Sequence, residues 1–191
     1  MFEIDQTPIL ILSAPRTGST VLGAHIKSLC KKDIPYFQEP DYAGQEGIES
    51  FRKHFAQSKE FILKCHLTNL YMYGRDVSDY LLQEAYLIRI RRKDVVKQAL
   101  SFYIALARNN QWEFTDKSQL TLSDNISINV IRMKYAIKLI KEANHLLDTI
   151  PVNFKLDLYY EDLPEFNSSE YYVTPRPLNY NELLNVMQTL I

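Results

Sequence analysis

The chain has 191 residues, of which 46% are apolar and 24% charged, and its formal net charge is −1 at pH 7. These values predict one globular domain over residues 1–191 and give no indication of a nucleic-acid partner. The two cysteines cannot form a disulfide framework, and no apolar run approaches the length of a membrane span. We therefore expect a cytoplasmic protein without a membrane span.

Only five glycines occur, which restricts the phosphate-binding loops that the chain can contain. Gly18 and Gly23 have the GxxxxG spacing of a nucleoside-triphosphate P-loop, but Ala24 and His25 follow where that motif requires Lys and then Ser or Thr. No GxGxxG sequence is present. The glycine positions therefore disfavour a standard kinase and a dinucleotide dehydrogenase.

Strand-like runs alternate with helix-like runs along the chain, which predicts an α/β fold with three α/β/α layers and a mainly parallel central sheet. The expected strands cover about residues 8–13, 60–66, 85–91 and 152–159. The expected helices cover about residues 19–29, 47–56, 76–84, 94–108 and 124–150. The least regular segments are 109–123 and 164–179.

The segment between the first expected strand and the first expected helix has the composition of an anion site. It contains Arg16, Thr17, Gly18, Ser19 and Thr20. Backbone N–H groups at a helix N-terminus are unpaired, and the helix dipole favours negative charge there. The glycine permits close approach of a ligand, and the arginine can bind a phosphate or sulfate through two parallel hydrogen bonds. A capped helix beside a surface arginine is the simpler interpretation, but the buried strand before the loop favours a ligand site.

Two other strand ends carry candidate polar groups. Lys64 and His66 are two residues apart in an expected strand, so their side chains share one face. Arg91 and Arg92 end another expected strand and precede a helix that contains Ser101. Each group by itself fits an ordinary role, namely a histidine bonded to backbone and a solvated cluster of cations. The loop at 16–20 makes ligand binding the better interpretation.

Four segments, in order along the chain, resemble those of sulfotransferases that use 3′-phosphoadenosine-5′-phosphosulfate (PAPS). Segment 15–20 (PRTGST) resembles the phosphosulfate-binding loop P-[KR]-[ST]-G-[ST]-[ST]. Segments 63–67 (LKCHL), 91–101 (RRKD followed by QALS) and 160–163 (YEDL) resemble the family's K-T-H-L, 3′-phosphate and Y-E-D-L segments. The resemblance covers residues 9–163. It implies a P-loop-like sulfotransferase fold and metal-free transfer of a sulfuryl group from PAPS to a hydroxyl of a small molecule, such as a sugar or a lipid headgroup.

The resemblance also implies which residues bind the phosphate groups of PAPS. They are Arg16, Thr17, Gly18, Ser19, Thr20, Arg91, Arg92 and Ser101. Of the two adjacent arginines, Arg92 matches the 3′-phosphate position best and Arg91 is the alternative. The loop residues would hold the 5′-phosphate and the sulfuryl oxygens.

The implied catalytic residues are Arg16, Lys64, His66 and Glu39. His66 matches the family's catalytic histidine, and a side chain with an unperturbed pKa of about 6.5 is suited to accept the proton of an acceptor hydroxyl. Glu39 resembles a glutamate of the bacterial carbohydrate sulfotransferases and is a rival base. The sequence leaves the choice between them open. Cys65 is expected in the core rather than as a nucleophile.

The chain also departs from the family. No glycine follows Gly74, so the C-terminal R-K-G and G-x-x-G-x-x-K segment of cytosolic sulfotransferases is absent. We expect the acceptor pocket to come from residues 39–55, 71–80 and 109–119. Two other functions remain open: a small-molecule kinase that uses the same loop, and a non-catalytic module with a sulfotransferase-like fold that binds a nucleotide or another anion.

Overall fold

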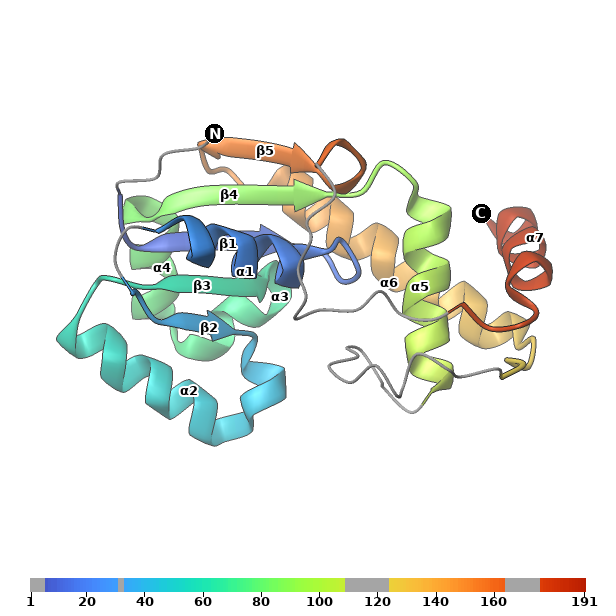
Figure 1. Ribbon diagram of the computed structural model, residues 1–191, viewed down its shortest axis with the longest axis horizontal. Coiled ribbons are helices and arrows are strands. Elements are labelled where there is room, and N and C mark those ends of the chain that lie inside the picture. The colour runs from blue at the N-terminus through green and yellow to red at the C-terminus, as the bar shows by residue number, and fades with distance from the viewer. Residues whose placement is uncertain (1–5, 31–32, 109–123, 164–175) are drawn as a thin grey trace.

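The computed structural model describes residues 6–30, 33–108, 124–163 and 176–191. Its centre is a parallel sheet of five strands in the order β2-β3-β1-β4-β5 (Figure 1). The strands are β1 (Ile9–Ser13), β2 (Tyr36–Gln38), β3 (Ile62–His66), β4 (Tyr86–Arg91) and β5 (Leu156–Tyr159). The α-helices are α1 (Ser19–Leu29), α2 (Pro40–Gln57), α3 (Leu67–Leu70), α4 (Arg75–Glu84), α5 (Val95–Ala107), α6 (Val130–Thr149) and α7 (Tyr180–Leu190). The described residues also form the 3₁₀-helices η1 (Tyr71–Tyr73) and η3 (Tyr160–Asp162).

Helices cover both faces of the sheet, which confirms the expected three-layer α/β/α fold (Figure 1). Successive residues of a strand point to opposite faces. Ile9 and Ile11 of β1 pack in a cluster with Leu22 of α1, whereas Leu10 packs in a cluster with Leu81 of α4 on the other face. All five residues of β1 are buried, as expected for the central strand of a sheet that is covered on both sides.

The boundaries of two expected helices were wrong. The helix expected at 47–56 begins earlier, at Pro40, and bends at Gly44, where φ is 57°. The helix expected to begin at residue 124 begins at Val130, because the Asn129 side chain caps it by accepting a hydrogen bond from the N–H of Arg132. The sequence also failed to predict β2, α3 and α7; β2 and α3 have only three and four residues.

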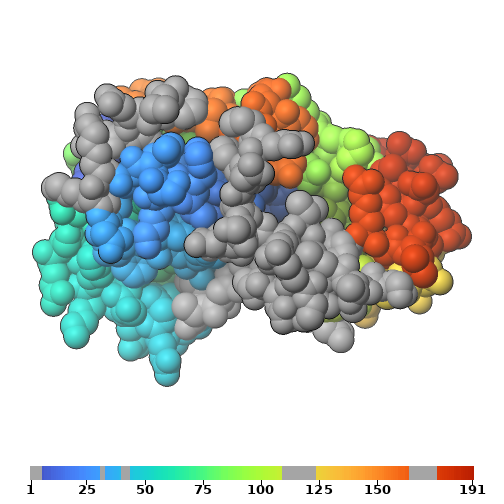
Figure 2. Space-filling model, in the orientation of Figure 1, coloured from blue at the N-terminus to red at the C-terminus, as the bar shows by residue number. Residues whose placement is uncertain are grey.

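Beyond the carboxyl ends of the strands, α5, α6 and α7 pack against one another around a core of their own (Figure 1). Tyr103, Met133, Ile140, Leu183 and Met187 are fully or almost fully buried there. In the space-filling view, α7 forms the end of the molecule opposite α2 (Figure 2). Among the helices of the described ranges, none is both long enough and apolar enough to cross a bilayer.

Candidate functional site

The polar residues singled out in the sequence lie at the carboxyl edge of the sheet. Glu39 follows β2, His66 ends β3, the loop 14–18 follows β1, Arg92 follows β4 and Tyr160 follows β5. The strand order reverses at β1, because β1 pairs with β3 on one side and with β4 on the other. Ligands of open α/β sheets bind outside the carboxyl ends of the strands at such a reversal. The loop 14–18 therefore occupies the position expected for a ligand site.

The loop itself is tightly folded. Gly18 and Arg16 both have left-handed backbone conformations, with φ values of 76° and 64°. For a residue with a side chain this conformation costs about 1–2 kcal/mol, so tertiary contacts must hold Arg16 in place. Thr17 is fully buried, and its hydroxyl donates to the carbonyl of Ala14 at 3.1 Å. This hydrogen bond and the two left-handed residues determine the path of the chain from β1 into α1.

Two side chains from α5 provide such tertiary contacts. Arg16 Nε donates to Ser101 Oγ at 2.9 Å, although the two residues are 85 positions apart in the chain. Gln98 is fully buried, and its Nε2 donates to the carbonyl of Pro15 at 2.7 Å. Sequence reasoning assigned no role to Gln98; a glutamine within an apolar helix face is the signal that could have pointed to it. Helix α5 therefore contacts the loop twice, once at the Pro15 carbonyl and once at the Arg16 side chain.

Arg92, which follows β4, also contacts the loop. Its Nη1 donates to the carbonyl of Arg16 at 3.3 Å, and its guanidinium lies over the Tyr160 ring with 5.0 Å to the ring centroid. Its Nε is buried and has no hydrogen-bond partner among the described residues, although Glu161 Oε1 lies 3.5 Å away. A Cβ added at Gly18 would lie only 2.6 Å from Tyr160 Cε2, so glycine permits the close packing of this ring. Two arginines and one serine thus meet at the loop.

Arg91, the alternative to Arg92, does not lie at the loop. Its guanidinium forms ion pairs with Asp157 at 2.7 Å and with Asp148 at 3.2 Å. Arg89, two residues earlier on the same face of β4, pairs with the same two carboxylates. The structure therefore brings only one of the two adjacent arginines to the candidate anion site.

Glu39, Lys64 and His66 form a buried group at the ends of β2 and β3. Glu39 and Lys64 are almost fully buried, and Lys64 Nζ donates to Glu39 Oε1. His66 Nε2 lies 3.0 Å from the same carboxylate oxygen. Burial acts to raise the pKa of Glu39, but the hydrogen bond from His66 and the charge of Lys64 outweigh it and lower the pKa to about 2. The two candidate bases are therefore direct partners.

Cys65 points to the opposite face of β3, as expected, and is fully buried in the core between the sheet and α4. Burial raises the pKa of its thiol well above the usual range. Because the thiolate is the nucleophilic form, the position is unsuited to nucleophilic catalysis.

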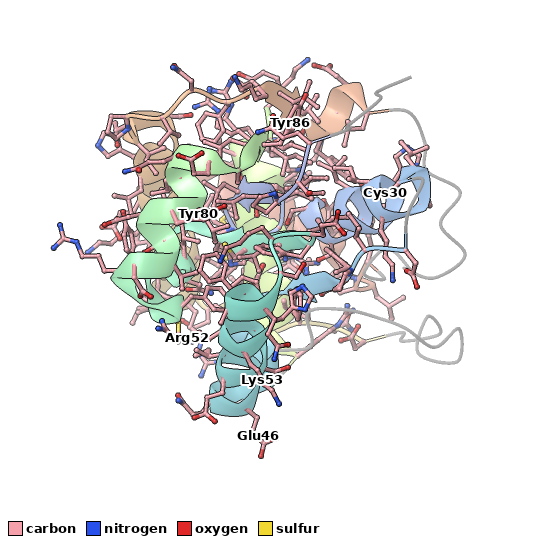
Figure 3. All side chains as sticks on the ribbon, turned by 90° about the vertical axis from the view of Figure 1, so that its left-hand side faces the viewer. Cys30, Glu46, Arg52, Lys53, Tyr80 and Tyr86 are labelled. Atoms are coloured by element: carbon pink, nitrogen blue, oxygen red, sulfur yellow. The ribbon has the colours of Figure 1, made fainter. Side chains whose placement is uncertain are left out.

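Two of the three segments expected to form the acceptor pocket pack against each other. Arg52 of α2, labelled in Figure 3, donates to the carbonyl of Tyr73 and pairs with Asp76 of α4 at 3.3 Å. The buried rings of Phe51 and Tyr73 have centroids 4.6 Å apart. The third segment, 109–119, lies outside the described residues.

No protein-family model and no curated protein sequence matches this chain. Within the described ranges, no group of three His, Cys, Asp or Glu side chains is arranged to hold a metal ion.

Two clusters make up the candidate site: the loop 14–18 with Arg92 and Ser101, and the buried group of Glu39, Lys64 and His66. In β1 and β3, Ser13 at the start of the loop aligns with His66, so the clusters begin on neighbouring strands.

Proposed function

We propose that the chain is a sulfotransferase that transfers a sulfuryl group from PAPS to a hydroxyl of a small-molecule acceptor. The observation that carries the proposal is the contact of Arg16 with Ser101 and with Arg92 at the loop after β1. A nucleotide with phosphates on both the 3′ and 5′ positions of one ribose requires cations and hydroxyl donors at adjacent positions. Guanidinium groups bind such oxygens through charge-assisted hydrogen bonds.

The residues at the loop suit a ligand with two phosphates. Within the part of the chain that the structure describes, the buried Nε of Arg92 lacks a hydrogen-bond partner, so it can donate to a phosphate oxygen. Arg16 supplies a permanent positive charge, and the N–H groups that begin α1 favour an anion. When bound, PAPS supplies the sulfuryl group: the acceptor oxygen forms an O–S bond as the S–O bond to the phosphate breaks, and the electron pair leaves with the phosphate. The cations of this chain stabilise that charge.

Within this proposal, His66 accepts the acceptor's proton and Glu39 positions the histidine ring. A carboxylate whose pKa is about 2 is a weak base near neutral pH, so Glu39 is poorly suited to remove the proton. A hydrogen bond from Nε2 to Glu39 leaves Nδ1 as the proton-accepting atom of the neutral ring. Lys64 keeps Glu39 ionised and thereby favours this orientation.

A thermal-shift comparison of nucleotides tests the binding part of the proposal. We expect 3′-phosphoadenosine-5′-phosphate to raise the melting temperature clearly more than ATP with magnesium, because it alone carries a 3′-phosphate. Equal shifts would contradict the assignment of Arg92 and Ser101. The Arg92→Ala variant should lose the preference, whereas Arg91→Ala, which removes an equal charge outside the site, should retain it.

Transfer of labelled sulfate from PAPS to a panel of sugars, phenols and aliphatic alcohols tests catalysis. Nucleotide binding without transfer to any acceptor would indicate the non-catalytic module instead. With an acceptor in hand, His66→Ala should abolish transfer, while Asp162→Asn, which breaks the exposed ion pair with Lys93, should leave it intact. Full activity of His66→Ala together with loss of activity in Glu39→Ala would reverse the assignment of the base.

A further inference from the structure

One end of the molecule carries exposed apolar side chains that the proposed site does not use. Ile131 is 83% and Tyr135 55% exposed, and Ile128 and Val130 beside them are exposed as well. Ile131 and Tyr135 are four residues apart, so both lie on the outward side of α6, while Met133 between them is fully buried. Large apolar side chains that gather on one exposed face mark an interaction surface.

The same stretch of α6 is strongly basic. Between Val130 and Lys141 there is no Asp or Glu, and the four cations, all exposed, are Arg132, Lys134, Lys138 and Lys141. The first carboxylate is Glu142, which pairs with Lys138 at 3.7 Å. Since the net charge of the whole chain is −1, this concentration of positive charge is local. We refer to the exposed residues of segment 128–141 as the α6 face.

The turn before α7 carries two further exposed side chains at this end of the molecule. Leu178 is 70% exposed, and its N–H donates to the carbonyl of Asp124 at 2.9 Å, so the turn lies beside the segment that leads into α6 (Figure 1). Arg176 in this turn is exposed, and the carboxylate of Asp124 is paired with Arg108. The turn therefore adds one apolar and one cationic side chain.

We propose that the α6 face binds peripherally to a membrane surface that contains anionic lipids. Its aliphatic side chains and Tyr135 would enter the region between headgroups and acyl chains, while the lysines meet lipid phosphates. Tyrosine is favoured at this depth because its ring is apolar and its hydroxyl is polar. The outward side of a helix is convex. A protein partner must offer a pre-formed complementary surface of roughly 800 Å² to bind it stably, whereas a fluid lipid surface adapts to the shape.

Sedimentation with vesicles tests this proposal without any nucleotide or acceptor. We expect the chain to sediment with phosphatidylcholine vesicles that contain phosphatidylserine, less with pure phosphatidylcholine, and less at high salt. Lys134→Ala/Lys138→Ala should weaken partitioning at least about tenfold, because each lysine near an anionic surface contributes about fivefold. Ile131→Ser/Tyr135→Ser should weaken it on both vesicle types.

The matched control removes the same charge from the other end of the molecule. Lys53→Ala/Arg75→Ala changes two exposed cations, Lys53 on α2, which Figure 3 labels, and Arg75 on α4. This variant should sediment like the unmodified chain. Two results would overturn the proposal: no sedimentation with the anionic vesicles, or equal losses in the control and α6-face variants. A dimer in analytical ultracentrifugation that Ile131→Ser converts to a monomer would overturn it too, because a second copy would then occupy the α6 face.

Discussion

The buried pair of Glu39 and Lys64 predicts a strong coupling between two substitutions. Lys64→Met leaves the carboxylate with His66 as a partner but without its ammonium, whereas Glu39→Gln leaves the ammonium without its anion. Because both side chains are almost fully buried, Glu39→Gln should lower the free energy of unfolding by about 3–5 kcal/mol, and Lys64→Met should lower it by less because His66 remains. The double variant Lys64→Met/Glu39→Gln has no unpaired charge, and its glutamine can still accept a hydrogen bond from His66.

Urea unfolding at pH 7, followed by far-ultraviolet circular dichroism, measures this coupling. We expect the double variant to lose far less stability than the sum of the two single losses. If the losses are additive, the two charges do not interact in the folded protein and the reasoning about this site is wrong. A control pair, Lys93→Met/Asp162→Asn, removes an exposed ion pair and should show little coupling.

The same pair predicts a defined pH dependence. The pKa of Glu39 is about 2 in the folded chain, below the unfolded value of about 4.3, so the stability it adds is present near neutral pH and is lost as the pH falls. The difference corresponds to about 3 kcal/mol, lost between about pH 5 and pH 2. Relative to the double variant, the unmodified chain should therefore lose about this amount on acidification. Parallel stability curves would refute the lowered pKa.

Two further predictions concern the loop after β1. In calorimetry, Arg16→Ala should weaken binding of 3′-phosphoadenosine-5′-phosphate at least about tenfold, because it removes a charge-assisted contact. Arg91→Ala should leave the affinity unchanged, and equal effects of the two variants would contradict the placement of the anion site. Gly18→Ala should destabilise the chain more than Gly44→Ala in urea unfolding. Both glycines have positive φ, but an added Cβ meets the Tyr160 ring only at Gly18 and open space at Gly44; equal losses would show that the Tyr160 contact contributes nothing.

Local features of the sequence were sufficient to predict much of the fold and part of the candidate site. The strand, loop and helix at 9–29 follow from a short apolar run, a glycine and a helical repeat, all within one stretch of chain. The common face of Lys64 and His66 follows from the two-residue period of a strand. Both features depend only on residues that are close together in the sequence, because the geometry of a single helix or strand fixes how such residues are arranged.

Tertiary structure decided which distant groups meet. Glu39 is 25 residues from Lys64, and only the pairing of β2 with β3 makes it a partner of both Lys64 and His66. Likewise, Arg91 and Arg92 are adjacent arginines that the sequence does not distinguish. The alternation of side chains along β4 directs Arg91 to Asp148 and Asp157, whereas Arg92 follows the strand and contacts the loop. Local propensity contains no information on such contacts. They arise because the strands pair in parallel, which places their carboxyl ends at one edge, and because the strand order decides which ends are neighbours.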